Sequence, residues 1–404
     1  MKREDKMSKK ILLLCTVFIF VLIGYQIVDK IKLSNQIESV SEFNAKYILS
    51  QHAYKSSVLV DVGGDGSIID YEELPIETGI EHSFLKQLGN KVYFDGYIAK
   101  TPSVYDYELK QTLSLPKLNK IYEVINPFSQ HLFLTLNGGF SENSLYNSGA
   151  CYLNERWICK EFEDELAVRS GVVFNNKVFL YANTASPDVD ENNHLLIDEK
   201  ILVYDESFNL LHTYNVYDEL GMANSTIDFY QNGNKLFLFG TDIETGEFAI
   251  FEIEDDLIIK EKLAFPETNP EIRDYCVPAS RFSNDSNELF LEILCDKSPQ
   301  ASDYQSGLYQ EDNMLLKIDL NNLGNNNNYE VFLYGDKRVA GIDFKENLIL
   351  LEERINNNES IEVDIYDTDF NKVGLTSLEN FDGRTPTLID ISPVLIMKDS
   401  ELGT

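Results

Sequence analysis

Acidic residues gather around three glycines in the stretch between positions 61 and 73. Asp61, Asp65, Asp70 and Glu72 place four carboxylates within this short stretch. Carboxylate oxygens are the ligands that Ca²⁺ prefers, and glycine lets a loop turn tightly around an ion. The spacing therefore predicts a calcium site.

The order of residues in this stretch is similar to the loop of an EF-hand, with Asp at loop positions 1 and 5, Gly at 6 and Glu at 12. It departs from that loop at Gly63 and Ile69, where ligands are expected, and residues 57–60 before it predict a strand instead of a helix. A glycine-rich hairpin turn also explains these residues. Apart from Ca²⁺ at this loop, no cofactor is expected.

Three further carboxylates share one local context, in which an aspartate follows isoleucine and precedes an apolar residue. These are Asp228, Asp343 and Asp390. Each lies in a short apolar segment that we expect to form the innermost strand of a repeat. There they would line a central channel, where they could hold a cation or act in acid–base catalysis. The alternative is that they cap strand ends or accept bonds from neighbouring backbone.

Four cysteines follow the N-terminal apolar segment. Cys151 and Cys159 flank a short turn around Glu155, which would place them opposite each other on paired strands. Cys276 and Cys295 lie in neighbouring predicted strands. We expect two disulfides, Cys151–Cys159 and Cys276–Cys295, although four cysteines allow three pairings. Four reduced, buried cysteines are the alternative.

The overall composition excludes some classes of function. The 67 acidic and 34 basic residues give a net charge of −33, and such a surface repels phosphate backbones, so nucleic acid is not an expected partner. The sequence has no Gly-x-Ser-x-Gly elbow, phosphate-binding loop or Cys-x-x-Cys pair, and its five histidines show no ligand spacing. No catalytic residues are predicted.

A short apolar motif recurs along the chain, with Asn-Lys-Leu-Phe-Leu as one copy. The copies occupy residues 90–94, 130–134, 176–180, 234–238, 287–291, 346–350 and 392–396. The mean spacing is about 50 residues, which is typical of β-propeller blades. Each unit also contains a second pair of apolar runs around a polar turn; residues 201–211 and 363–373 are the best-matched example. Four short strands per unit predict a blade of antiparallel sheet.

The first and last units are incomplete. Residues 387–398 predict two strands and residues 57–74 predict a hairpin, and joining them would complete a seventh blade and leave no open edge between the first and last blades. In this architecture the chain resembles bacterial membrane-anchored β-propeller proteins, over residues 56–400. The resemblance implies an all-β, seven-bladed β-propeller of four-stranded antiparallel blades. It carries no specific family motif, so it implies no particular activity.

The N-terminal part predicts a membrane anchor. Residues 11–28 contain no charge and are long enough for a helix that crosses a bilayer. Five basic residues precede them and two follow closely, which places the N-terminus in the cytoplasm. A cleaved signal peptide is the alternative. We divide the chain into a cytoplasmic tail (1–10), a single-pass transmembrane signal anchor (11–28), a short helical stalk (29–55) and an extracytoplasmic propeller (56–404).

These inferences lead to a functional hypothesis. The chain is expected to be a binding or scaffolding module at the cell membrane, whose acidic surface and long polar loops engage an envelope protein, peptide or glycan. The alternative is a propeller-fold hydrolase or lyase that acts on an envelope carbohydrate or peptide through the channel carboxylates. A third interpretation is a structural module that calcium stabilises through Asp61 and Asp65.

Overall fold

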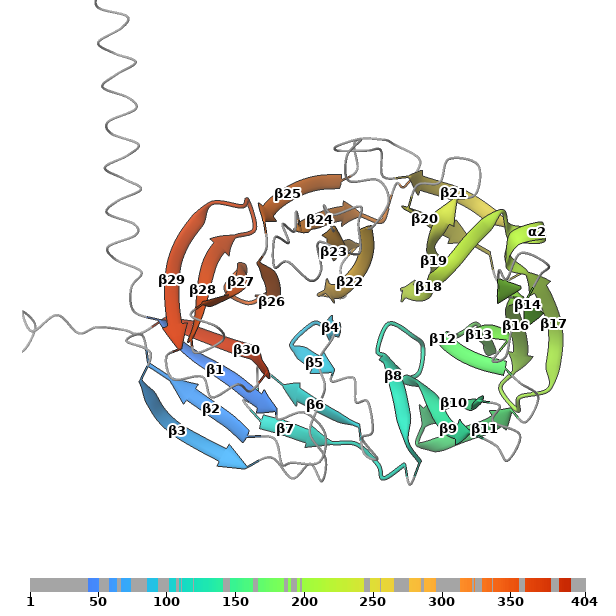
Figure 1. Cartoon of the computed structure of the whole chain (residues 1–404), viewed down its shortest axis with the longest axis horizontal. Helices are drawn as coiled ribbons and strands as arrows, with labels where there is room; N and C mark the ends of the chain where they lie inside the picture. Colours follow the sequence, from blue (N-terminus) through green and yellow to red (C-terminus); the bar gives the residue numbers. More distant parts are fainter. Residues whose placement is uncertain are drawn as a thin grey trace, which may run out of the picture.

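The computed structural model describes residues 43–50, 58–63, 67–73, 86–93, 102–106, 109, 111–118, 120–140, 146–162, 166–184, 188–189, 195–196, 198–242, 248–254, 256–264, 276–284, 287–295, 313–321, 323, 329–335, 337–355, 360–378 and 385–393. Within them the chain is built almost wholly of β-strands. Their sheets are arranged around a common centre (Figure 1). The all-β class predicted from the sequence is confirmed.

Five of the sheets in the described residues have four strands in antiparallel order. The first contains β1 (Phe43–Ser50), β2 (Val58–Val62), β3 (Ile68–Glu73) and β30 (Thr385–Pro393). The second contains β8 (Tyr122–Asn126), β9 (Phe133–Phe140), β10 (Tyr146–Asn154) and β11 (Arg156–Phe162). The third contains β12 (Leu166–Phe174), β13 (Lys177–Thr184), β16 (Glu199–Asp205) and β17 (Leu210–Asn215).

The fourth sheet contains β18 (Met222–Asn232), β19 (Lys235–Asp242), β20 (Phe248–Ile253) and β21 (Ile259–Ala264), and the fifth contains β26 (Arg338–Asp343), β27 (Leu348–Ile355), β28 (Ser360–Asp367) and β29 (Lys372–Leu378). Two small elements accompany the third sheet. They are the hairpin of β14 (Asp188–Val189) and β15 (Leu195–Leu196), and the helix α2 (Val216–Leu220), which Asn215 caps.

A larger sheet of eight strands joins two sets of four. One set is β4 (Lys86–Leu88), β5 (Lys91–Tyr93), β6 (Ser103–Asp106) and β7 (Gln111–Ser114); the other is β22 (Cys276–Ser283), β23 (Glu288–Cys295), β24 (Asn313–Asp319) and β25 (Tyr329–Gly335). The two sets meet where β4 pairs with β22 in parallel, over three residue pairs. Every other strand pair in the described residues is antiparallel, so this contact differs from the pairing inside each set.

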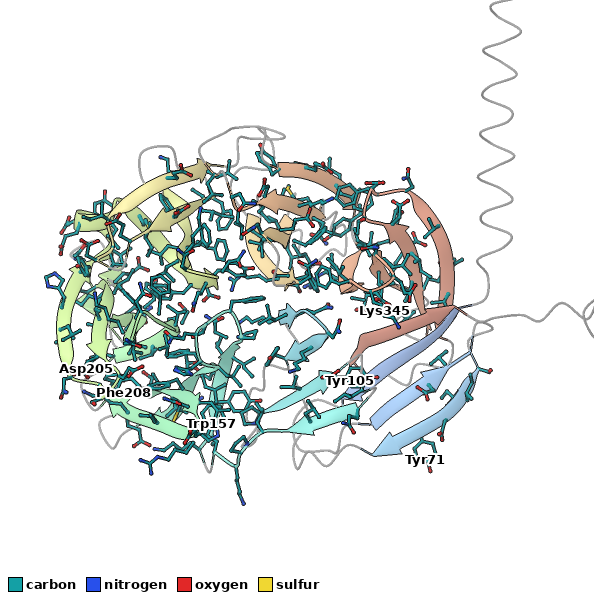
Figure 2. The ribbon with its side chains drawn as sticks, turned by 180° about the vertical axis from the view of Figure 1, so that it is seen from behind. Tyr71, Tyr105, Trp157, Asp205, Phe208 and Lys345 are labelled. Atoms are coloured by element: carbon teal, nitrogen blue, oxygen red, sulfur yellow. A yellow bond between two sulfur atoms is a disulfide. The ribbon has the colours of Figure 1, made fainter. Side chains whose placement is uncertain are left out.

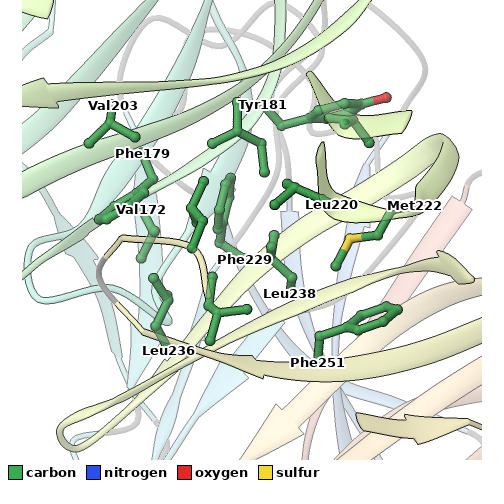
Figure 3. Packing of buried hydrophobic residues seen from close by; sticks show 14 of the residues in the cluster. Val172, Phe179, Tyr181, Val203, Leu220, Met222, Phe229, Leu236, Leu238 and Phe251 are labelled. Atoms are coloured by element: carbon green, nitrogen blue, oxygen red, sulfur yellow. The ribbon is translucent and has the colours of Figure 1, made fainter. Parts of the chain in front are cut away.

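The hydrophobic core lies between neighbouring sheets. Figure 3 shows one such layer, in which Val172, Phe179 and Val203 of the third sheet face Phe229, Leu236 and Leu238 of the fourth. All of these side chains are 5% exposed or less. Alternation along each strand sends one set of apolar side chains to each face, so one sheet can contribute to two such layers. The third sheet does so, because its Val178, Leu180 and Leu202 belong to a second cluster with residues of the second sheet.

The predicted equivalence of residues 201–211 and 363–373 is confirmed in detail. Asp205 accepts bonds from the backbone nitrogens of Ser207 and Asn209, both 2.8 Å from Oδ1. Phe208 then adopts a left-handed conformation with φ of 58° and packs against Tyr152 of the preceding sheet. Figure 2 labels Asp205 and Phe208 at this turn.

The second copy of this turn repeats the same arrangement. Asp367 accepts bonds from the backbone nitrogens of Asp369 at 3.0 Å and Asn371 at 2.8 Å. Phe370, with φ of 63°, stacks on Phe332 with ring centroids 4.7 Å apart. Each turn thus places one aromatic side chain between its own sheet and the previous one. The packing of this ring, which is buried for Phe208 and partly buried for Phe370, offsets the strained backbone.

Two predictions for the N-terminal part need correction. The helical stalk is wrong for residues 43–50, because these form strand β1 between β2 and β30. Among the described residues, the closing sheet therefore takes three strands from the N-terminal part and one from the C-terminal part, while the second predicted C-terminal strand, within residues 394–398, lies outside them. Apolar residues in this segment fit either a helix or a strand, and pairing on both sides decides for the strand. The first strand of the propeller, β1, therefore begins before position 56, where the propeller was predicted to start.

The predicted transmembrane anchor, residues 11–28, lies outside the described residues. Within the part that is described, no helix is long and apolar enough to cross a membrane.

Candidate functional site

Polar side chains from four inner strands meet in the interior, and we call them the central cluster. It consists of Lys86 and Gln87 on β4, Asn126 at the end of β8, Asp228 on β18 and Arg281 on β22. All five are 9% exposed or less. Buried polar groups are costly unless they are paired, so their partners decide what this cluster can do.

Asp228 and Arg281 form a buried ion pair. The Arg281 guanidinium Nη1 donates to Asp228 Oδ2, and the backbone nitrogen of Phe229 donates to Oδ1 over 2.7 Å. The guanidinium also lies over the ring of Phe239, with its central carbon 4.9 Å from the ring centroid. The pair joins two sheets, because β18 and β22 belong to different ones.

Lys86 brings a second positive charge into the same region. Its Nζ donates to the carbonyl oxygen of Ile125 over 2.8 Å. Lys86 is the register partner of Arg281 in the parallel pairing of β4 and β22. Two cations therefore flank the single carboxylate of Asp228, and Asp228 balances part of their charge.

Two amide side chains in the cluster bridge separate strands through the backbone. Asn126 Nδ2 donates to the carbonyl of Gly171 on β12 at 2.9 Å and to that of Phe229 on β18 at 3.1 Å. Gln87 Nε2 donates to the carbonyl of Ile342 at 2.6 Å, while the Ile342 nitrogen donates to Gln87 Oε1 over 3.2 Å. These side chains replace backbone pairing where different sheets approach one another.

The charges around Asp228 fix its protonation state. Burial alone would raise the pKa of this carboxyl group, but Arg281 first and then Lys86 lower it, and the bonds from Arg281 and Phe229 lower it further. The net result is a pKa below the usual value for aspartate. At neutral pH Asp228 is therefore a carboxylate held in place, which is a poor starting point for a general acid or base.

The other two predicted channel carboxylates do not join Asp228 in the described contacts. Asp343 is the last residue of β26, and its Oδ1 accepts from the backbone nitrogens of Lys345 at 2.9 Å and Glu346 at 3.0 Å. Asp228 lies four residues before the end of β18, a difference of roughly 13 Å along a strand. Aspartates with the same Ile-Asp context therefore lie at different positions along their strands. Asp390 pairs in register with Lys46, and its side chain is outside the described part.

The predicted calcium loop is described only in part. Asp61 and Asp70 are register partners on β2 and β3, whereas Asp65 and the side chain of Glu72 lie outside the described residues. Across the described residues, no group of three or more His, Cys, Asp or Glu side chains is placed to hold a metal ion. Calcium binding by Asp61, Asp65, Asp70 and Glu72 stays a prediction, and calorimetric titration of the chain with Ca²⁺ tests it.

The cysteines lie as the sequence suggests. Cys151 and Cys159 are register partners on β10 and β11 and are joined by a disulfide, with their Cα atoms 4.1 Å apart. Cys276 and Cys295 are register partners at the ends of β22 and β23. The second disulfide stays a prediction.

Sequence reasoning did not find four of the five members of the central cluster. Asp228 had a local pattern, but Arg281 lies 53 residues away in the chain, and Lys86, Gln87 and Asn126 stand in unremarkable segments. One available signal was Arg281 itself. A charged residue inside an apolar strand requires a buried partner of opposite charge.

The ring of four-stranded antiparallel sheets around this interior defines the chain as a β-propeller. No protein family matches the chain, and no curated protein matches it either.

Several solved structures are similar. The β-propeller domain of the Trilobed protease from Pyrococcus furiosus, described as having an open velcro topology, is 11% identical over 86% of this chain and 94% of that one, with a TM-score of 0.41. Cobalt-substituted apocarotenoid oxygenase from Synechocystis is 8% identical over 87% of this chain and 93% of that one, with a TM-score of 0.45. The acylaminoacyl peptidase from Pyrococcus horikoshii is 11% identical over 81% of this chain and 52% of that one, with a TM-score of 0.42.

Proposed function

We propose that this chain is a membrane-anchored, seven-bladed β-propeller that binds an envelope protein, peptide or glycan outside the cytoplasm. Residues 11–28 would cross the membrane once, with the N-terminus in the cytoplasm. The propeller would then be a rigid scaffold that presents its acidic surface and loops to the partner.

The count of seven blades follows from treating the eight-stranded sheet as two blades. In the sheet, the two sets of four strands are joined by the parallel pairs of β4 with β22, whereas strands inside a blade are antiparallel. Two blades from this sheet and five from the four-stranded sheets give seven. The blade that contains β1 and β30 would close the ring.

The observation that carries the binding role is the state of Asp228. Of Asp228 and Asp343, whose side chains are described, Asp228 is the more buried, and its carboxylate is bonded to Arg281 and to the backbone of Phe229. Its lowered pKa favours a permanent charge over proton transfer at neutral pH. The hydrolase or lyase alternative needs a carboxylate that can exchange a proton, so the pairing of Asp228 supports a structural role for this residue.

The bond between Cys151 and Cys159 supports an extracytoplasmic location. Disulfides persist in oxidising compartments and are rare where glutathione keeps thiols reduced. This disulfide lies in the part of the chain that follows the predicted anchor.

Affinity capture from gently crosslinked cells tests the binding role. The tagged full chain is purified from solubilised membranes, and the co-purifying molecules are quantified by mass spectrometry. We expect one envelope component in near-equal amount, with binding that weakens as salt is raised, because an acidic surface contributes to the contact.

An activity assay supplies the opposite outcome. Turnover of an envelope carbohydrate or peptide by the purified chain would contradict the proposal if Asp228→Asn abolished it while the fold was retained. Asp367→Asn is the matched control, since Asp367 holds an outer turn. The location is checked separately, by protease accessibility of the propeller in cells with a permeable wall.

A further inference from the structure

Most of the exposed apolar side chains gather at one kind of turn. In the described residues, 11 large hydrophobic side chains are exposed. Seven of them lie in the connection between the third and fourth strands of a sheet or in the first two residues of the fourth strand. These seven are Ile68, Ile69, Leu109, Leu210, Leu211, Ile258 and Ile259. Apolar groups gathered in this way favour contact with another molecule.

A recurring β-bulge exposes neighbouring residues together. In the pairing of β2 with β3, Ile69 is the extra residue after Ile68. In the pairing of β16 with β17, Leu211 is the extra residue after Leu210. Successive side chains of a regular strand point to opposite faces, and a bulge re-aims one of them. Both members of each pair are thus exposed, Ile68 and Ile69 by 56% and 61% and the two leucines by 55% and 54%.

These turns lie on one face of the ring. In every four-stranded set the strands follow one another outward from the centre, with β30 innermost in the closing sheet (Figure 1). In such an antiparallel set, the first-to-second and third-to-fourth connections fall at the same end of the strands. The inner strands β4 and β22 run in the same direction, since they pair in parallel. The blades of a propeller are equivalent around its axis, so the seven residues share one face, which we call the turn face.

The chain enters the propeller on the turn face. Strand β1 starts at Phe43, at the end of the closing sheet where β30 stops. Ala45 lies opposite Val62, and Val62 lies opposite Ile68. Neighbouring strands are about 5 Å apart, so about 10 Å separate the start of β1 from the apolar turn of β2 and β3.

The predicted anchor keeps this face close to lipid. The anchor ends at residue 28, and residues 29–42 connect it to β1. Even a fully extended segment of this length spans only about 50 Å. Such a short connection gives the turn face a high effective concentration at the membrane surface, so weak apolar contacts are enough to hold it there. Turns from separate sheets on one face can also touch a flat surface at the same time.

We propose that the turn face rests on the lipid surface of the membrane that holds the anchor. The isoleucine and leucine side chains of the turns would enter the boundary between headgroups and acyl chains. This inference rests on the proposed membrane anchor and names the surface that orients the propeller. The net charge of −33 repels anionic headgroups, so the contact is apolar and zwitterionic lipid is the better partner.

The opposite face would then point away from the membrane. Helix α2 begins directly after the last residue of β17, whereas the apolar residues Leu210 and Leu211 begin that strand. Tyr217 on α2 therefore lies at the other end of the third sheet, and it is 60% exposed. This face is the one presented to the proposed envelope partner, and position 217 is a control for contact with lipid.

Photocrosslinking of the full chain in phosphatidylcholine vesicles tests the contact. A photoreactive phenylalanine analogue is placed at position 69, 258 or 217, which are 61%, 57% and 60% exposed, and lipid adducts are quantified by mass spectrometry. We expect positions 69 and 258 to give at least about tenfold more adducts than 217, because burial of even two CH₂ groups favours one orientation by that factor. Replacing half of the lipid by phosphatidylglycerol should lower the yield, and a higher yield would overturn an apolar contact.

Paired variants separate the turns from other exposed apolar residues. With the probe kept at position 69, Leu210→Ser with Leu211→Ser removes an apolar turn in a different sheet, and we expect about tenfold fewer adducts. Leu333→Ser with Leu375→Ser is the matched control, because these leucines are 58% and 40% exposed on outermost strands but lie outside the turns. Denaturation midpoints check that both variants are folded. Equal yields in the two variants would overturn contact through the turn face.

Further outcomes would also contradict the proposal. Equal adducts from 69 and 217 would show a propeller that turns freely on its anchor, and adducts from 69 without 258 would overturn contact by the whole face. A crosslink from 69 or 258 to a protein, including a second copy of the chain, would replace lipid as the partner. Alkaline extraction of cell membranes tests the anchor itself. Release of the chain would contradict the proposed membrane location, whereas a retained chain without lipid adducts at 69 contradicts the turn face contact alone.

Discussion

The central cluster and strand β3 use charged residues in opposite ways. In the interior, Asp228 and Arg281 are buried and bonded to each other. On β3, Asp70 is exposed and faces Asp61, a residue of the same charge. The interior charges connect sheets that lie far apart in the chain, whereas the acidic pair of β2 and β3 has a basic neighbour in its own sheet, since Lys46 on β1 is the register partner of Asp61.

This difference in burial predicts which substitutions cost stability. Removing one buried charge leaves its partner uncompensated, so interior substitutions should act on the free energy of unfolding. Substitutions of the exposed side chains on β3 should leave that free energy nearly unchanged. The following predictions test this division.

The largest effect is expected for Arg281→Ala. It leaves the Asp228 carboxylate buried without its partner, and we expect a loss of about 3–5 kcal/mol in the free energy of unfolding. Chemical denaturation of the purified chain measures it. The double variant Arg281→Met with Asp228→Leu removes both charges and should recover most of the loss. A double variant as unstable as Arg281→Ala would show that lost packing, not the uncompensated charge, is responsible.

The disulfide should contribute less, because its loop is short. Replacing both Cys151 and Cys159 by serine is expected to lower the free energy of unfolding by about 2–3 kcal/mol. The main cause is that the unfolded chain gains conformational entropy when the cross-link is lost. Reduction of a chain with serine at positions 276 and 295 should give a similar shift in the denaturation midpoint, because Cys151–Cys159 is then the disulfide that is reduced. Counting free thiols in the denatured chain provides the check, and a reactive Cys151 without reductant would contradict the bond.

The difference in pH dependence between the wild type and the double variant isolates Asp228, because Asp205, whose pKa is also lowered, is present in both. Because the pKa of Asp228 is lowered in the folded state, this residue contributes stability above the unfolded pKa of about 4, and that contribution is lost as the pH falls through the folded pKa. Protonation of Asp228 makes the free energy of unfolding fall with decreasing pH by at most about 1.4 kcal/mol more per pH unit. Denaturation curves below about pH 4 should therefore fall faster for wild type than for the double variant without both charges. Parallel curves would show that the Asp228 carboxylate is not stabilised by folding.

The smallest effect on stability is expected for Tyr71→Lys. The side chain is exposed, so the free energy of unfolding should change by less than about 0.5 kcal/mol. The melting temperature of the purified chain measures this change, with Tyr217→Lys as the matched substitution. A large loss for Tyr71→Lys alone would show that β3 stabilises the closing sheet through this ring, and the division between interior and edge would fail.

The repeat and its turns could be predicted because local sequence determines them. Tyr204-Asp205 and Tyr366-Asp367 each precede a turn in which the aspartate bonds backbone nitrogens within four residues. The disulfide could be predicted for the same reason, because Cys151 and Cys159 are close in sequence and flank a hairpin turn.

The errors arose where distant strands decide the structure. Residues 43–50 contain apolar side chains at spacings that fit a helix as well as a strand, and only pairing with β2 and β30 selects the strand. Likewise, the equivalence of Asp228 and Asp343 failed because the two occupy different registers relative to the following hairpin. No local pattern contains this information.

The pairing of β1 with β30 has a consequence for how the chain is made. These strands lie more than 300 residues apart, with Tyr47 opposite Leu388, and contacts between distant residues form slowly. During synthesis β1 emerges early but gains its inner neighbour only after residues 385–393 have been added. Until then one edge of β1 is open to wrong pairing, which is a known route to aggregation. A ribosome that stalls before residue 385 would thus release a product with an exposed edge, one that proteases and chaperones can distinguish from the finished protein.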